Sequence, residues 1–89
     1  MTLGRVVGTV VATRKEERLA GFKLSIVEAV DLDLRATGAF TVCVDPVGAG
    51  PGEIVLTSAG SSARLTNFTK DRPVDAVIVG IVDSVTVGD

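Results

Sequence analysis

A glycine-rich loop constrains this chain more than any other feature of its sequence. The loop consists of Gly48, Ala49, Gly50, Pro51, Gly52 and Glu53. Glycine admits positive φ angles and proline locks its own φ, so glycines at alternate positions around one proline predict a loop of defined shape. Apolar runs at residues 39–44 and 53–57 flank the loop, and the first of them has the two-residue period of a strand. We therefore expect the loop to join two β-strands.

Strand-forming residues dominate the rest of the sequence as well. Hydrophobic residues make up 46% of the 89 residues, yet the chain holds three Phe and neither Tyr nor Trp. The apolar mass is therefore mostly Val, Ile, Leu and Ala, and β-branched side chains favour strands. The runs expected to be strands are residues 3–13, 22–30, 39–44, 53–57 and 74–87. Together they predict an all-β fold, a small five-stranded barrel with a single domain over residues 1–89.

The connections are expected to be polar turns with only a trace of helix. Residues 14–21, 31–38 and 66–73 are charged or polar. Residues 60–65 contain small residues with hydroxyl groups, which predict one short capped helix at residues 61–65. Gly8 inside the first run predicts a bend or a close approach of two backbones, and Cys43 is expected to be a small core residue.

The last run carries apolar side chains on both of its faces. Ala76, Ile78 and Val82 share one face, and Val77, Val79 and Ile81 share the other. A strand with one solvated face would alternate with polar residues, and no helix is expected to be long enough to cover the second face. We therefore expect a partner chain to cover it, so that Val77, Val79 and Ile81 form a subunit interface.

Residues suited to catalysis or metal binding are scarce. The chain has no His and one Cys, and neither Ser61 nor Ser62 lies in a G-x-S-x-G sequence. The glycine spacing fits neither a Walker loop nor a dinucleotide-binding fingerprint. The acidic candidates are Asp45, Glu53, Asp75 and Asp83. Carboxylates at strand ends are more often solvated or paired with arginine, so we expect no enzyme activity, no catalytic residues, no cofactor and no metal.

The charge distribution argues against nucleic acid and membrane partners. Nine basic and eleven acidic residues give a formal net charge of −2, and the basic residues do not cluster. Binding of single-stranded nucleic acid would require exposed aromatic residues in a basic groove. The N-terminus lacks the pattern of a signal peptide, and no apolar run reaches the roughly 18 residues of a membrane span. We therefore expect a soluble intracellular protein.

Several sequence blocks, taken together and in order, resemble one protein family. They are LGRVVGTVVATRK at residues 3–15, LAGFKL at 19–24, VDPVGAGPGE at 44–53, GSSAR at 60–64 and PVDAVIVGIVD at 73–83. This combination is similar to the bacterial microcompartment vertex proteins, the pentameric shell proteins that include the carboxysome and ethanolamine-utilisation vertex subunits. The resemblance covers nearly the whole chain. Its departures from the family pattern are Pro51, at the open position of G-A-G-x-G-E, and residues 31–38.

The resemblance implies a barrel related to the oligonucleotide-binding fold, assembled as a homopentamer that caps the fivefold vertices of a shell in the bacterial cytoplasm. Its implied partners are the hexameric and pseudo-hexameric shell proteins, which form the flat tiles. Two alternatives stay open, namely a nucleic-acid-binding barrel and a ring-forming accessory subunit of an enzyme.

Two stretches are candidate sites on such a ring. The loop at residues 48–53 is expected to contact neighbouring tiles, with Glu53 anchoring it through backbone N–H groups or an arginine. The alternative is that the loop only turns the chain between two strands. Gly60, Ser61 and Ser62 are expected to line a central pore that holds an anion, or else to let two backbones pack closely.

Overall fold

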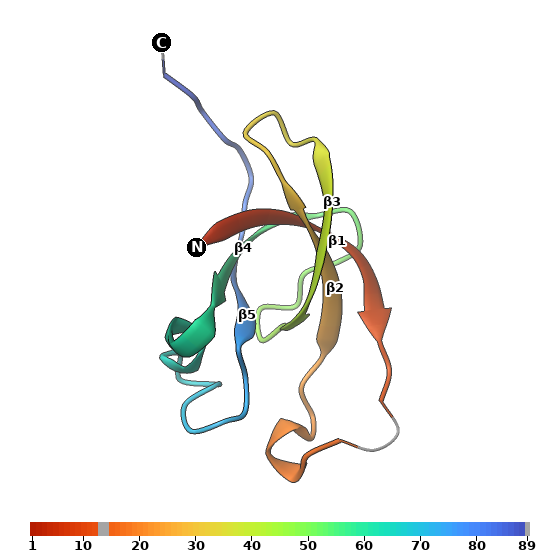
Figure 1. Ribbon diagram of the computed structural model, residues 1–89, viewed down its shortest axis with the longest axis vertical. Helices are drawn as coiled ribbons and strands as arrows, with labels where there is room; N and C mark the ends of the chain where they lie inside the picture. Colours follow the sequence, from red (N-terminus) through yellow and green to blue (C-terminus); the bar gives the residue numbers. More distant parts are fainter. Residues whose placement is uncertain (13–14, 89) are drawn as a thin grey trace.

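Five strands form one closed barrel in the computed structural model, which describes residues 1–12 and 15–88 (Figure 1). The strands are β1 (Thr2–Val10), β2 (Leu24–Val30), β3 (Ala36–Val44), β4 (Ile54–Ala59) and β5 (Ala76–Ile81). The 3₁₀ helix η1 (Glu17–Leu19) connects β1 to β2, and the 3₁₀ helix η2 (Gly60–Arg64) connects β4 to β5. The order around the barrel is β1-β2-β3-β5-β4, so the expected all-β barrel is confirmed.

Strand β1 lies between β2 and β4 and pairs antiparallel with both. The β2–β3 and β4–β5 pairs are also antiparallel. Strands β3 and β5 run parallel and are joined at a single residue pair, Val44 with Val77. The β1–β2 register shifts between Val6 and Gly8, which confirms the bend predicted at Gly8.

The first and last strands are shorter than the sequence predicts. Strand β1 ends at Val10, and the expected continuation at Thr13, like Arg14 in the following turn, lies outside the described residues. Strand β5 ends at Ile81 rather than at residue 87. The next residue, Val82, still donates its N–H to the Ile54 carbonyl at 2.8 Å, and beyond it the chain leaves β4 and runs away from the barrel (Figure 1).

Strand β3 begins earlier than predicted, inside the stretch expected to be a polar connection. It starts at Ala36 because the turn before it is short and closed by a side chain. The Asp31 carboxylate accepts hydrogen bonds from the N–H groups of Asp33 and Arg35, at 2.8 and 3.0 Å. An aspartate that bonds to the backbone two residues ahead is typical of a tight turn, so β2 and β3 form a long hairpin.

The apolar residues form two clusters. The first, inside the barrel, contains Val6, Val27, Cys43, Ala49, Val55, Ala76 and Ile78. The second, on the outer side of β3 and β5, contains Val44, Ala63, Val74 and Val77, with Leu19, Phe22, Leu24 and Val79 packed against it. Cys43 is 1% exposed, which confirms it as a core residue. Its neighbours Phe40 and Val42 point the other way and are 61% and 49% exposed.

The expectation that only a partner chain can cover the outer face of the last strand is wrong for Val77. This residue is fully buried within its own chain, where it packs with Val44, Ala63 and Val74. Without a long helix, the chain is expected to leave this face uncovered. Instead, the short helix η2 and the segment before β5 cover it. Val77 therefore offers no surface to a second chain.

Candidate assembly site

The first half of the glycine-rich loop is held by one buried carboxylate. Asp45 follows β3 directly, is 5% exposed, and accepts three backbone N–H groups at 2.8–3.0 Å, those of Val47, Gly48 and Ala49. Lys23 lies beside it, with Nζ 3.6 Å from Asp45 Oδ2. The same ammonium donates to the Ala49 carbonyl at 2.7 Å. Two side chains therefore fix three consecutive peptide units of the loop.

The second half of the loop is closed by Glu53. Its Oε1 accepts the Gly50 N–H at 2.6 Å, and its own N–H donates to the Gly50 carbonyl at 3.2 Å. Two further bonds join this half of the loop to β1, since Gly52 N–H donates to the Val6 carbonyl and Val6 N–H to the Glu53 carbonyl. The prediction that Glu53 anchors the loop through a backbone N–H group is confirmed.

Conformation explains two of the loop glycines. Gly48 and Gly52 have φ angles of +79° and +85°, and a Cβ on either would meet nothing within 4 Å. These positions therefore need glycine for its left-handed backbone. Gly50 differs, because a Cβ there would lie 3.2 Å from Glu53 Oε1 and would press on the anchor.

The loop combines a buried anchor with an exposed tip. The Ala49 side chain is fully buried in the barrel cluster. The next residues along the chain return to the surface, where Pro51, Gly52 and Glu53 are exposed. Every backbone turn of the loop is thus set by the fold itself, and the exposed tip is presented in one shape.

The prediction that strand-end carboxylates are solvated or paired with arginine is wrong for Asp45. Its side chain is buried, and its partners are Lys23 and the loop backbone. A local signal for this role exists in the sequence, since an aspartate followed within three residues by glycine is typical of a side-chain-closed turn. Lys23 has no such signal, because it comes from β2's side of the barrel, 26 residues before Ala49.

The candidate pore residues lie on η2, which is tied to the start of β5. Gly60 N–H donates to the Asp75 carbonyl at 2.8 Å, and Arg64 Nη1 donates to the Val74 carbonyl at 3.2 Å. Ala63 of η2 is fully buried in the second cluster. The GSSAR block therefore has a packing role within one chain.

The serines do not cap this helix, contrary to expectation. The N-cap position is Ala59, which makes no side-chain hydrogen bond, and both serines fall inside the 3₁₀ turn. Gly60, Ser61 and Ser62 are all exposed. Their position at a central pore stays a prediction.

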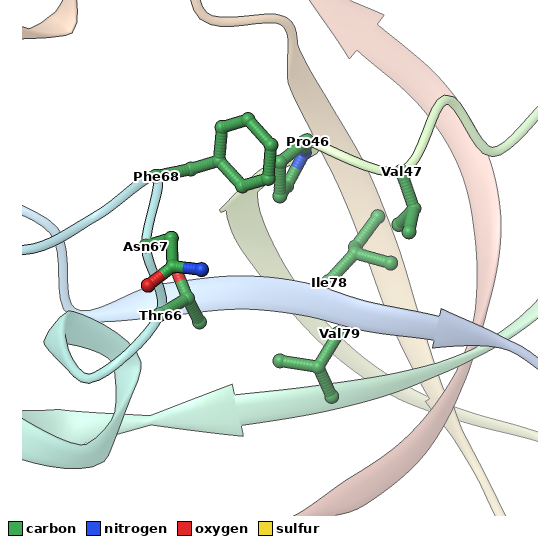
Figure 2. Close-up of a pocket in the computed structure, with 7 residues that line it drawn as sticks. All are labelled: Pro46, Val47, Thr66, Asn67, Phe68, Ile78 and Val79. Atoms are coloured by element: carbon green, nitrogen blue, oxygen red, sulfur yellow. The ribbon is translucent and has the colours of Figure 1, made fainter.

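Next to the loop, an apolar groove of about 260 Å³ opens beside β5 (Figure 2). It is lined by Pro46, Val47, Thr66, Asn67, Phe68, Ile78 and Val79. Figure 2 shows Phe68 turned toward Pro46, with Ile78 and Val79 carried by β5. Val79 is half-buried, and Phe68 is 61% exposed.

Of the three residues predicted to form a subunit interface, Val79 and Ile81 keep exposed surface. Ile81 is 40% exposed, and Val79 is accessible through the groove. Sequence reasoning missed Phe68, because it lies in a stretch that reads as polar. An isolated aromatic residue in such a stretch is the signal that identifies it.

The described residues offer no centre for covalent or metal chemistry. Within residues 1–12 and 15–88, no group of three or more His, Cys, Asp or Glu residues is placed to hold a metal ion. Burial, with the nearby Asp75 and Asp45 carboxylates, raises the pKa of the Cys43 thiol to about 11, so this thiol stays protonated and inert at neutral pH. In the same part of the chain, no helix has the length and hydrophobicity to span a membrane.

The barrel presents a preformed exposed loop and an apolar groove, which are surfaces suited to contacts with other chains and so to a structural or assembly protein. The chain matches the family model described as ethanolamine utilisation protein EutN/carboxysome over residues 1–83. It is 51% identical to the bacterial microcompartment shell vertex protein GrpN of Rhodospirillum rubrum, over 96% of each chain.

Solved structures agree with this match. The GrpN pentameric microcompartment shell protein from Rhodospirillum rubrum superposes with a TM-score of 0.91 at 49% identity, covering 99% of this chain and 100% of that one. CcmL of Gloeobacter violaceus superposes with a TM-score of 0.93 at 44% identity, covering 98% of this chain and 90% of that one. The chain belongs to the EutN/CcmL family of microcompartment shell vertex proteins. Since these are structural shell proteins, the expected absence of enzyme activity is confirmed by the family.

Proposed function

We propose that five copies of this chain form a ring that caps a fivefold vertex of a microcompartment shell in the bacterial cytoplasm. Hexameric and pseudo-hexameric tiles make flat sheets, and a flat sheet closes into a polyhedron only where a fivefold unit removes a wedge. The proposal is supported by a structural match that covers almost the whole chain, to a relative described as pentameric. It is also supported by the position of Val79 and Ile81, which keep apolar surface on the outer side of β5.

The loop at residues 48–53 contacts the edge of the neighbouring hexameric tile, and we call this contact the seam. The observation that carries this part is the prebuilt loop, whose bonds to Asp45 and Glu53 are complete within one chain. A preformed loop loses little conformational entropy on docking, which matters where each tile edge is small. Its exposed tip has glycine at position 52, so a neighbouring backbone can approach closely.

Adding one side chain to the tip tests the seam. Gly52→Asn places a side chain in open space at φ +85°, and asparagine tolerates this backbone better than most residues. Gly21→Asn is the matched control, since Gly21 has φ +83° and also meets nothing within 4 Å. Each variant is co-expressed with a hexameric shell protein, and closed shells are counted by electron microscopy.

We expect Gly52→Asn to keep its oligomeric state while the yield of closed shells falls, and Gly21→Asn to behave like the wild type. If Gly52→Asn dissociates the ring, the loop serves subunit assembly instead of the seam. If Gly52→Asn closes shells as well as the control does, the loop has no contact with the tiles and only turns the chain between β3 and β4.

A further inference from the structure

Strand β3 has a long free edge. On the side away from β2, its only strand partner among the described residues is β5, and that pairing is limited to Val44 with Val77. The rest of the strand, from Ala36 to Val42, is exposed along its whole length. Backbone N–H and C=O groups along such an edge are ready to pair with another strand.

Beyond Ala39, this edge lacks the features that normally protect free edges. Natural proteins protect such edges with charged side chains, proline, β-bulges or very short strands. Strand β3 has nine residues, ATGAFTVCV, and none is charged or proline. Its register with β2 shifts near Gly38, where the Gly38 and Ala39 N–H groups donate to the side chains of Glu28 and Thr37, so the unprotected part of the edge is residues 40–42. Two of its outward side chains, Phe40 and Val42, are also apolar and 61% and 49% exposed. An unprotected edge with an apolar face indicates that something covers it in the assembled protein.

The segment after β5 has the complementary properties. Residues 83–88 follow Val82 with a bend at Asp83, and within the described chain they make no backbone hydrogen bond. Their sequence alternates Ser84 and Thr86 with Val85 and Val87, which is the two-residue period of a strand with one apolar face. Val85 is half-buried and Val87 is 60% exposed. Figure 1 shows this segment leaving the barrel toward the same end as the turn between β2 and β3.

We infer that residues 83–88 of one subunit add as an extra strand to the free edge of β3 in the next subunit. The inference rests on the ring proposed above. Each chain carries one donor segment and one acceptor edge, which are different surfaces, and contacts of that kind form a ring when the rotation between neighbouring subunits closes. Strand addition gives backbone hydrogen bonds, and alternate side chains give specificity. Here Val85 and Val87 pack on the same face as Phe40 and Val42, so ring closure leaves no edge of β3 unpaired.

Charge substitutions on the two faces of the donor segment test this inference. The double variant Val85→Asp/Val87→Asp places charge on the apolar face, and Ser84→Asp/Thr86→Asp places the same charge on the opposite face. The ring dissociation constant is measured by native mass spectrometry across a dilution series. We expect the first variant to weaken the ring by roughly tenfold or more, because it buries unpaired carboxylates, and the second to stay close to the wild type.

A cysteine pair places the two segments directly. Val42→Cys is combined with Val85→Cys or with Val87→Cys, and cross-strand neighbours are close enough to form a disulfide. Cys43 can stay, because its protonated thiol is buried. At least one pair should give covalent ladders of up to five chains under oxidation, and Val42→Cys with Thr86→Cys should not.

The outcomes separate this inference from the proposed ring. A wild-type chain that is monomeric overturns both. A wild-type pentamer that keeps its dissociation constant in Val85→Asp/Val87→Asp, and gives no cross-linked ladder in either cysteine pair, overturns strand addition and leaves the ring intact.

Discussion

At the scale of single residues, Asp45 explains why the glycine-rich loop has one shape. It is the only carboxylate of the described residues that accepts three backbone N–H groups, and it does so from a buried position beside Lys23. Hydrogen bonds from backbone N–H groups to an ionised carboxylate are stronger than those to a neutral acceptor. The loop glycines allow the turn, and Asp45 selects it.

Replacing Asp45 with Ala should destabilise the protein substantially. The change leaves the buried Ala49 N–H and the part-buried N–H groups of Val47 and Gly48 without an acceptor, and we expect the free energy of unfolding to fall by about 2–4 kcal/mol. Urea denaturation at one fixed protein concentration measures this loss. The control is Asp83→Ala, an exposed carboxylate after β5, which should change stability by about 0.5 kcal/mol or less. Equal stability of the two variants would contradict the role of Asp45 as the anchor of the loop.

At the scale of secondary-structure elements, β1 is held along both of its edges, by β2 and by β4. Gly4 lies opposite Ala29 of β2 and Val55 of β4. A Cβ at Gly4 would overlap the Val27 side chain and lie 3.1 Å from the Glu28 carbonyl oxygen. Gly8 sits beyond the register shift, where the nearest atom, Ile26 Cδ1, would be 3.5 Å away. The two glycines of this strand therefore have different tolerances.

Gly4→Ala and Gly8→Ala form a matched pair that tests this difference. The first overpacks the β1–β2 contact, so we expect it to lower the free energy of unfolding by about 1–3 kcal/mol. The second makes an ordinary contact and restricts the unfolded chain, so it should stay within about 1 kcal/mol of the wild type. Thermal and urea unfolding of both variants give the comparison, and a larger loss for Gly8→Ala would show that the β1–β2 register is misassigned.

The strands themselves were largely predictable from sequence, and their ends were not. The two-residue period and the β-branched composition identify all five strands, because these signals are local. The start of β3 at Ala36 depends on a turn closed by Asp31. The end of β5 at Ile81 depends on where its antiparallel neighbour β4 begins, because Ile81 pairs with Val55. The cover over Val77 depends on η2 folding back, which no local pattern of residues encodes.

At the scale of the whole molecule, the site is a set of surfaces, and sequence predicted them unevenly. The loop at residues 48–53 was predictable because glycine and proline punctuate the chain. The groove at Phe68 and Val79 brings together residues from the segment before the loop, the segment after η2 and β5, so only the fold assembles it. The same holds for the free edge of β3. Each of these surfaces is exposed in the single chain, and each gains a partner if the chain assembles with other copies of itself and with its neighbours in a shell.

Native mass spectrometry of the unmodified protein at micromolar concentration tests that assembly most directly. One chain has a mass of 9.1 kDa, so a ring of five has five times that mass, about 46 kDa. We predict a single dominant species at this mass. On dilution the ring should give way to the mass of one chain, because assembly depends on protein concentration. A protein that stays at the mass of one chain, or that forms a dimer or a hexamer instead of a pentamer, would contradict its role as the fivefold cap of a shell.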